Sequence, residues 1–95
     1  MHARVTFTQG TADMVDEAIR QVRAILPMYQ KQKGFKGMYT FANRETGKGF
    51  TVSLWETEAD LLVSEEMGNR ARQDVTKASH ITATAVERYE VVLHP

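Results

Sequence analysis

The side chains best suited to chemistry are few and lie far apart along the chain. His80 is the only histidine away from the two termini, and an imidazole can act as a general base near neutral pH. Trp55 and Tyr39 offer flat rings for stacking, and Asn43 and Arg44 offer hydrogen-bond donors. Simpler roles compete with these: a helix C-cap for His80, a packing anchor for Trp55, sheet core for Tyr39 and a solvated turn for Arg44.

Metal and nucleophile chemistry find little support in the sequence. The chain has no cysteine, and no two histidines stand three or four residues apart, as zinc ligands on one helix would. Glu65 and Glu66 have no nitrogen ligands nearby in the sequence, and no serine sits in a nucleophile elbow. We therefore expect no metal.

Length and charge exclude further classes. The 95 residues make one domain, spanning 1–95, and the 12 basic residues balance the 12 acidic ones. Without a basic excess we expect no nucleic-acid partner. No apolar stretch approaches the roughly 18 residues of a membrane span, and the first residues lack a signal-peptide core. These features predict a cytoplasmic protein without a membrane partner.

Two strands in the middle of the chain would position most of these side chains. Residues 35–43 are rich in aromatic and β-compatible side chains, and residues 49–55 alternate between apolar and hydroxyl side chains. The polar segment 44–48 predicts a turn in which Gly47 takes a positive φ. Thr57, followed three residues later by Asp60, predicts a helix start directly after the hairpin.

The flanking segments complete the predicted order. We expect a first strand beginning near Ala3, and a helix from about residue 13 that Pro27 ends or kinks. Residues 58–66 and 70–79 predict helical pieces weakened between them by Gly68, with one broken helix or two left open. Residues 86–93 predict the last strand.

The resulting β-α-β-β-α-β order predicts an α+β, ferredoxin-like fold, with a four-stranded antiparallel sheet and both helices on one face. Large apolar side chains occur at both parities of the central strands, as in Met38, Tyr39 and Phe41. Alternate residues of a strand point to opposite faces, so whichever set faces the helices, the other set makes the second face apolar. Monomers rarely expose such a patch. We therefore expect a two-fold homodimer that covers this face.

Three segments carry a resemblance to a known family. They read Gly34-Phe35-Lys36-Gly37-Met38-Tyr39, Glu45-Thr46-Gly47-Lys48-Gly49-Phe50 and Ser53-Leu54-Trp55-Glu56-Thr57-Glu58. This pattern resembles the antibiotic biosynthesis monooxygenase (ABM) family of dimeric α+β barrels, and the resemblance covers essentially the whole chain in topology. It implies a homodimer whose two sheets form a barrel, with a pocket in each protomer between its helices and its sheet.

The family includes haem-degrading monooxygenases, and the resemblance can be tested at their haem-binding positions. These members use an Asn on the first strand, a Trp on the second helix and a haem-ligating His on the following helical piece. The corresponding positions fall near Ala3, Ser64 and Asp74, and all three differ. Haem degradation and a haem cofactor are therefore disfavoured, with His80 as the one alternative ligand.

The family also includes cofactor-independent oxygenases of polycyclic phenols and quinones, and this branch is the function we expect. Such an enzyme binds a flat phenol, stabilises its anion and excludes water. The candidate residues for this chemistry are Trp55 and Tyr39 as stacking surfaces, Asn43 or Arg44 as donors to the phenolate, and His80 as the base. The expected pocket is lined by Phe7, Met28, Tyr39, Trp55 and Met67.

A second hypothesis is a non-catalytic, dimeric ligand-binding or stress-related accessory domain. In that case the pocket would be filled by the protein's own side chains. The lack of a convergent set of polar residues in the sequence favours this alternative, whereas the resemblance favours the enzyme.

Overall fold

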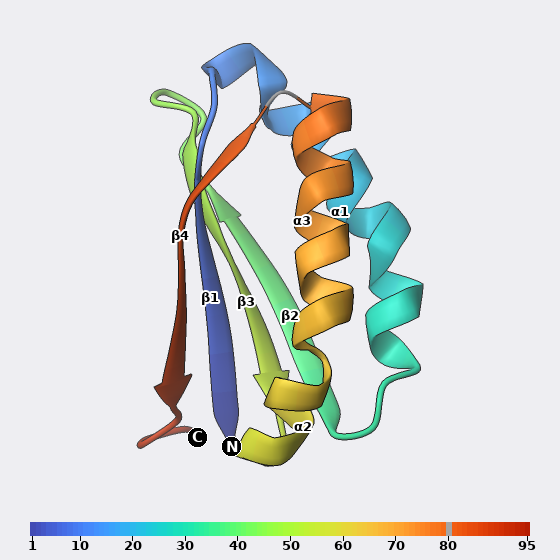
Figure 1. Cartoon of the computed structure of the whole chain (residues 1–95). Coiled ribbons are helices and arrows are strands. Elements are labelled where there is room, and N and C mark those ends of the chain that lie inside the picture. The colour runs from blue at the N-terminus through green and yellow to red at the C-terminus, as the bar shows by residue number, and fades with distance from the viewer. Residues whose placement is uncertain (80) are drawn as a thin grey trace.

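The computed structural model describes residues 1–79 and 81–95. The sheet consists of β1 (His2–Gln9), β2 (Phe35–Ala42), β3 (Lys48–Trp55) and β4 (Thr82–Glu90). A short 3-10 turn, η1 (Ala12–Met14), leads into α1 (Val15–Gln30), and α2 (Glu58–Val63) is followed by α3 (Glu65–Ser79). The strand order is β2-β3-β1-β4, with every neighbouring pair antiparallel. All helices cover the same face of the sheet (Figure 1), so the predicted ferredoxin-like fold is confirmed.

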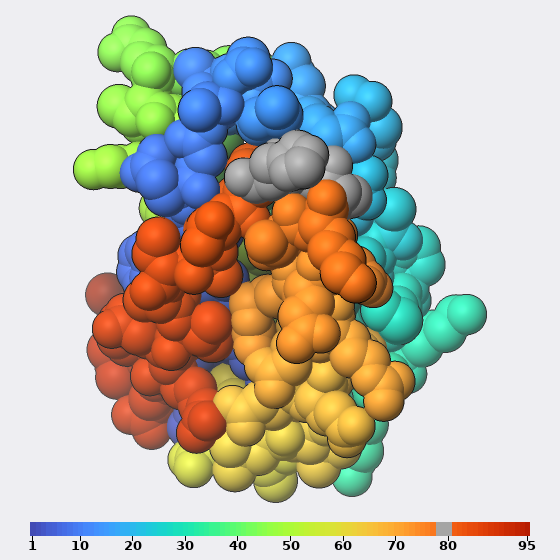
Figure 2. All heavy atoms as spheres, turned by 45° about the horizontal axis from the view of Figure 1, so that its top comes forward, coloured from blue at the N-terminus to red at the C-terminus, as the bar shows by residue number. Residues whose placement is uncertain are grey.

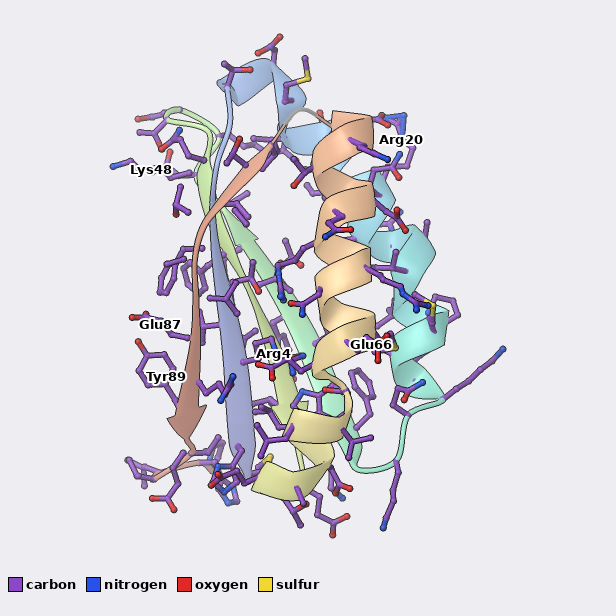
Figure 3. The ribbon with its side chains drawn as sticks, viewed as in Figure 1. Arg4, Arg20, Lys48, Glu66, Glu87 and Tyr89 are labelled. Carbon is purple, nitrogen blue, oxygen red and sulfur yellow. The ribbon has the colours of Figure 1, made fainter. Side chains whose placement is uncertain are left out.

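The register decides which side chains face the helices. Arg4 of β1 lies opposite Ser53 of β3 and Arg88 of β4, and Met38 of β2 also lies opposite Ser53. Arg4 reaches α2 through a hydrogen bond to the carbonyl oxygen of Leu61, which places this parity on the helix side. Figure 3 shows Arg4 on that side of the sheet, whereas Glu87 and Tyr89 lie on the other.

The core gathers around Trp55, which has no exposed surface. Its ring centroid lies 5.6 Å from that of Phe35 and 6.3 Å from that of Tyr29. An irregularity in the β2–β3 register between Phe35 and Gly37 leaves Phe35 opposite Trp55 and directed into this cluster. Leu61 and Ala71 close the core from the helices.

The local signals around the hairpin are confirmed. Gly47 has a φ of 75° and lies in the turn that joins β2 to β3. The side chain of Thr57 accepts a hydrogen bond of 3.1 Å from the backbone N–H of Asp60 and caps α2.

Of the two outcomes predicted for Pro27, an end or a kink of the first helix, the end is not found, because α1 continues through Pro27 to Gln30. Proline leaves the carbonyl of Arg23 without its usual donor. Arg23, Ala24 and Pro27 are all exposed, so water can satisfy that carbonyl and the helix tolerates the proline.

Two further boundaries differ from the prediction. The second helix breaks at Ser64 rather than at Gly68, because the Ser64 hydroxyl and Arg4 both donate to the carbonyl oxygen of Leu61 at the end of α2. The last strand spans Thr82–Glu90 rather than 86–93, because it pairs with β1 along its whole length, from Gln9–Thr82 to His2–Glu90.

Candidate functional site

A cavity of about 70 Å³ lies between the sheet and the helices. Val22 and Ile25 of α1, Met38 of β2 and Ala71 of α3 form much of its apolar wall. Tyr29, Arg72 and four threonines, at positions 6, 8, 51 and 76, supply polar groups. An apolar cavity of about 150 Å³ binds benzene, and this one has about half that volume, so its side chains would have to move to admit an aromatic ring.

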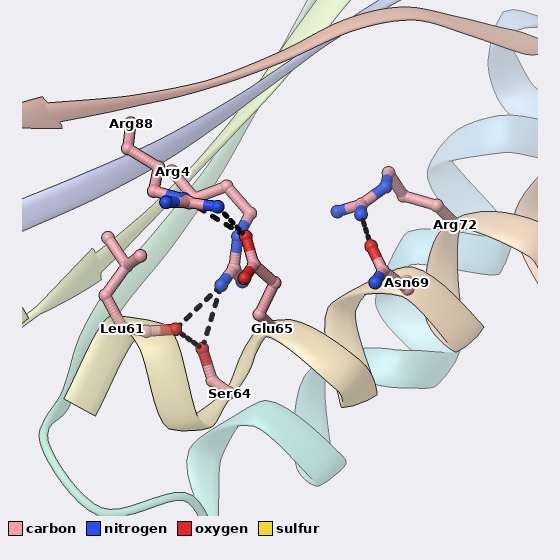
Figure 4. A network of polar contacts seen from close by, with 7 residues as sticks. All are labelled: Arg4, Leu61, Ser64, Glu65, Asn69, Arg72 and Arg88. Carbon is pink, nitrogen blue, oxygen red and sulfur yellow. Dashed lines mark hydrogen bonds and ion pairs between the residues drawn. The ribbon is translucent and has the colours of Figure 1, made fainter. Parts of the chain in front are cut away.

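Arg4 lies just beyond one end of this cavity, two residues along the same face of β1 from Thr6, which lines it. The arginine is only 2% exposed. Its Nη2 donates to the carbonyl oxygen of Leu61 at 2.8 Å and to Oγ of Ser64 at 3.2 Å (Figure 4). Its Nε and Nη1 are buried and have no hydrogen-bond partner among the described residues.

Arg4 is a desolvated cation in a cationic neighbourhood. Burial lowers the pKa of its guanidinium, and the charges of Arg72 and Arg88 act in the same direction, whereas Tyr29 and Glu65 oppose them. An arginine stays protonated in spite of such shifts. The site therefore holds a fixed positive charge with little solvent around it.

Two polar pairs border Arg4 from α3 and β4. The Nε of Arg88 donates to a carboxylate oxygen of Glu65 at 3.0 Å, and Arg72 donates to the side-chain oxygen of Asn69 (Figure 4). The Glu65 carboxylate is thus already engaged by Arg88 and is not available to Arg4 alone.

Tyr29 presents its ring to both the core and the cavity, and is 6% exposed. Burial raises the pKa of its phenol, and this rise is partly offset by the positive charges of Arg4 and Arg72. The balance leaves a neutral phenol beside two guanidinium groups.

The raised pKa of Tyr29 predicts a pH-dependent stability. Folding favours the neutral phenol, so this contribution is complete below the ordinary tyrosine pKa of about 10 and is lost as the pH rises through the higher folded value. We expect the free energy of unfolding to fall more steeply above pH 10 in the wild type than in Tyr29→Phe. Urea unfolding between pH 8 and pH 11 measures this, and parallel curves for the two proteins would contradict it.

A second hollow, of about 620 Å³, lies on the sheet face opposite the helices, at the end that carries the β2–β3 turn. The rings of Phe41 and Phe50 stack there with centroids 4.6 Å apart, and Phe7 lies 5.9 Å from Phe50. Asn43 and Lys48 form part of its polar rim. This hollow is open and largely aromatic.

The expected pocket residues are divided between the two faces of the sheet. Trp55 and Met67 pack on the helix side, whereas the register places Phe7 and Tyr39 on the open face. Met28 lies on α1 and is 42% exposed. The structure therefore does not bring these five side chains into one pocket.

The expected polar residues also lie apart. The side-chain oxygen of Asn43 accepts from the backbone N–H groups of Glu45 and Thr46, which shapes the turn. Arg44 forms an exposed ion pair of 2.8 Å with Asp16. His80 lies outside the described residues.

Sequence reasoning missed Arg4, Tyr29 and Arg72. Arg4 stands between Ala3 and Val5, and a charged residue inside a predicted strand was the one signal that could have drawn attention to it. Whether Arg4 points toward the helices depends on which alternate residues of β1 face them. The strand register decides this, and the register is known only from the structure.

The described residues contain no cluster of three or more histidine, cysteine, aspartate or glutamate side chains that could hold a metal ion. Within the same ranges, no helix is both long enough and apolar enough to cross a membrane.

Comparison with known sequences gives distant relatives of unknown function. No family model matches the chain. Two proteins of Mycobacterium tuberculosis, the uncharacterized proteins MT2634 and Rv2557 from two strains, are each 28% identical to it over 92 residues. The match covers 96% of this chain but only 41% of either relative, so the chain spans about two-fifths of the length of the curated relatives it matches.

Solved structures of the same fold are more informative. A Deinococcus radiodurans protein, provisionally named an antibiotic biosynthesis monooxygenase, superposes with a TM-score of 0.76 at 12% identity, over 100% of this chain and 96% of that one. The haem degrader MhuD of M. tuberculosis gives 0.75 at 17%, covering 100% and 99%. SnoaB, a cofactor-independent oxygenase of Streptomyces nogalater, gives 0.75 at 9%, covering 98% and 94%.

These likenesses establish the architecture. The chain has the fold of the ABM-like proteins, as the three sequence segments predicted. Identities of 9 to 17% carry the fold alone, so chemistry has to be argued from the site.

Proposed function

We propose that the protein is a cofactor-independent monooxygenase that acts on small aromatic compounds of the phenol or quinone type. The observation that carries this proposal is the cavity between sheet and helices, with an apolar wall and a cationic end formed by Arg72 and, behind it, Arg4. SnoaB, of the same fold, supports the reaction class.

The proposed chemistry takes its electrons from the substrate. A phenol gives up its proton, and the electron-rich phenolate ring reduces O2. One oxygen atom enters the ring, the other leaves as water, and the phenol becomes a quinone. The chain would bind the ring, exclude water and stabilise the phenolate with the charges of Arg4 and Arg72, since preorganised charge in a dry site is effective. We propose His80 as the base that takes the proton.

Haem does not fit this site. MhuD binds two haems, but the cavity here is about 70 Å³, against roughly 300–1,000 Å³ for ligand pockets in general. Ser64 is buried and bonded to Arg4, and Asp74 is exposed on α3, so neither supplies a haem contact in place of Trp or His. The proposed reaction therefore does not use haem.

An aromatic substrate requires the cavity to widen. Met38 and Ile25 line it, and a methionine side chain can adopt several conformations at low cost. We propose that these side chains repack as the ring enters between α1 and β2.

The small cavity favours a second candidate function, an accessory domain without catalysis. A space of about 70 Å³ is what a pocket filled by its own side chains would leave. Under this alternative the protein binds no ring and consumes no oxygen.

Oxygen uptake with a dihydroxynaphthalene separates the two candidates. We expect one O2 consumed per quinone formed, followed by electrode and absorbance, and at least a tenfold slower turnover in Arg72→Gln because one anion-stabilising charge is lost. Arg70→Gln is the matched control, since Arg70 is exposed on the same helix and pairs with Glu66. Absence of oxygen uptake and of quinone or haem binding in the wild type would favour the accessory domain.

We also propose that the protein is a homodimer that pairs through the open face of the sheet. Tyr39, Phe41 and Phe50 lie on this face and are 59%, 48% and 37% exposed. Phe7, Val5 and Val52 continue the apolar surface across β1 and β3. A two-fold pairing would bury this patch on both copies at once.

A further inference from the structure

Arg4 has more hydrogen-bonding capacity than the chain uses. Its two acceptors, the carbonyl of Leu61 and the hydroxyl of Ser64, are both neutral and both bond to Nη2. Within residues 1–79 and 81–95, Nε and Nη1 have no hydrogen-bond partner, and Arg4 is only 2% exposed. A buried cation in this condition is costly, and an anion that reached it would recover much of that cost.

A second guanidinium approaches the same point from α3. A Cβ built on Gly68 would lie 2.9 Å from Nη1 of Arg4 and 3.5 Å from Nη1 of Arg72. Both nitrogens therefore lie close to Gly68, and a methyl group there would crowd Nη1 of Arg4 while only touching Nη1 of Arg72. Two arginine donors from different elements, directed at one place, form a cradle for an oxyanion.

The local charges favour an anion. Among the described residues, Arg72, Arg88 and Glu65 are the other charged side chains that act on Arg4, so Arg4 and two further cations face one carboxylate. That carboxylate is engaged by Arg88. An anion at the cradle would thus reduce an excess of positive charge.

Arg72 borders two open spaces, and Arg4 and Gly68 line neither of them. Arg72 lines the cavity beside Tyr29, and it also lines a surface hollow of about 410 Å³ between α3 and β4, together with Glu65, Asn69, Val86 and Arg88. Figure 2 shows this side of the molecule, with α3 and β4 adjacent and the surface hollowed between them. A ligand that enters from this side meets Arg72 first, and the side chains that bury Arg4 have to move before it reaches Arg4.

We propose that Arg4 and Arg72, over Gly68, bind the carboxylate of a small aromatic acid whose ring extends toward Tyr29. The apolar part of the cavity wall, which includes Val22, Ile25 and Met38, favours an aromatic carboxylate over inorganic phosphate, because phosphate has no ring to pack against it. As a statement about the substrate this rests on the proposed function, and it narrows that function to hydroxylated aromatic acids.

Binding of 2-hydroxybenzoate, measured anaerobically by calorimetry, tests the site without turnover. We expect binding to the wild type, and at least tenfold weaker binding to Arg72→Gln and to Gly68→Ala, because hydrogen bonds to charged groups are worth about that much. Alanine favours a helix over glycine, so Gly68→Ala keeps α3 while its methyl group fills the cradle. Arg70→Gln should bind as the wild type does.

Two further probes complete the test: the neutral 2-hydroxybenzamide and inorganic phosphate. If 2-hydroxybenzamide binds as tightly as 2-hydroxybenzoate, the carboxylate charge is not recognised. If inorganic phosphate binds as tightly, the ring is not recognised. Either result overturns the proposal, as does wild-type affinity for 2-hydroxybenzoate in Gly68→Ala. Carboxylate binding without oxygen uptake would leave this site standing and remove the proposed reaction. Oxygen uptake with a dihydroxynaphthalene, without any carboxylate binding, would support the proposed reaction and overturn the carboxylate site.

Discussion

Replacing Trp55 with alanine is expected to lower the free energy of unfolding by about 3–5 kcal/mol. The indole is fully buried, its Nε1 donates to Oγ of Ser53 at 3.0 Å, and its ring packs between Tyr29 and Phe35. Domains of this size are stable by about 5–15 kcal/mol, so the loss would be a large share of the total. Urea unfolding followed by circular dichroism measures it, since Trp55 is the only tryptophan.

A graded pair of variants makes this prediction specific. Trp55→Phe keeps most of the ring volume and should cost less than Trp55→Ala, although it removes the donor to Ser53. Val63→Ala is the matched control, because Val63 is 81% exposed and should change stability by no more than about 0.5 kcal/mol. A loss below about 1 kcal/mol in Trp55→Ala, combined with loss of ligand binding, would instead assign Trp55 to the ligand site.

The sequence was most informative where a signal is local. Thr57 and Asp60 predicted the cap of α2, and Gly47 predicted the positive φ of the hairpin turn, because each depends on residues a few positions apart. The alternation around Trp55 predicted β3. With these elements in order, the ferredoxin-like topology followed from connection rules alone.

The site could not be predicted in the same way, because it depends on contacts between distant segments. Whether Phe7 or Thr6 faces the helices is fixed by the pairing of β1 with β3 and β4. The candidate role of Arg4 depends on its hydrogen bonds to Leu61 and Ser64, which lie 57 and 60 positions further along the chain. The same bonds moved the helix break from Gly68 to Ser64, and made Gly68 a packing position rather than a break.

Tyr39→Glu is expected to convert the proposed dimer into a monomer. Tyr39 is 59% exposed on the open face, so the substitution should leave the protomer folded. A two-fold interface places two copies of the new carboxylate in an apolar contact, and the loss of a central aromatic anchor commonly costs about 2 kcal/mol or more per copy. The summed loss of about 4 kcal/mol weakens association roughly a thousandfold. Sedimentation at micromolar concentration would measure the mass.

The matched control for this variant lies on the opposite side of the sheet. Val63→Glu introduces the same charge on α2 at a position that is 81% exposed, and it should leave the dimer intact. Phe41→Glu should repeat the effect of Tyr39→Glu, because Phe41 is 48% exposed on the same face and stacks on Phe50. A wild type that sediments as a monomer, or a Tyr39→Glu protein that remains a dimer, would show that this face is not the interface. The hollow lined by Phe7, Phe41 and Phe50 would then be a candidate ligand site on the open face, because its apolar rings would not be covered by a second copy.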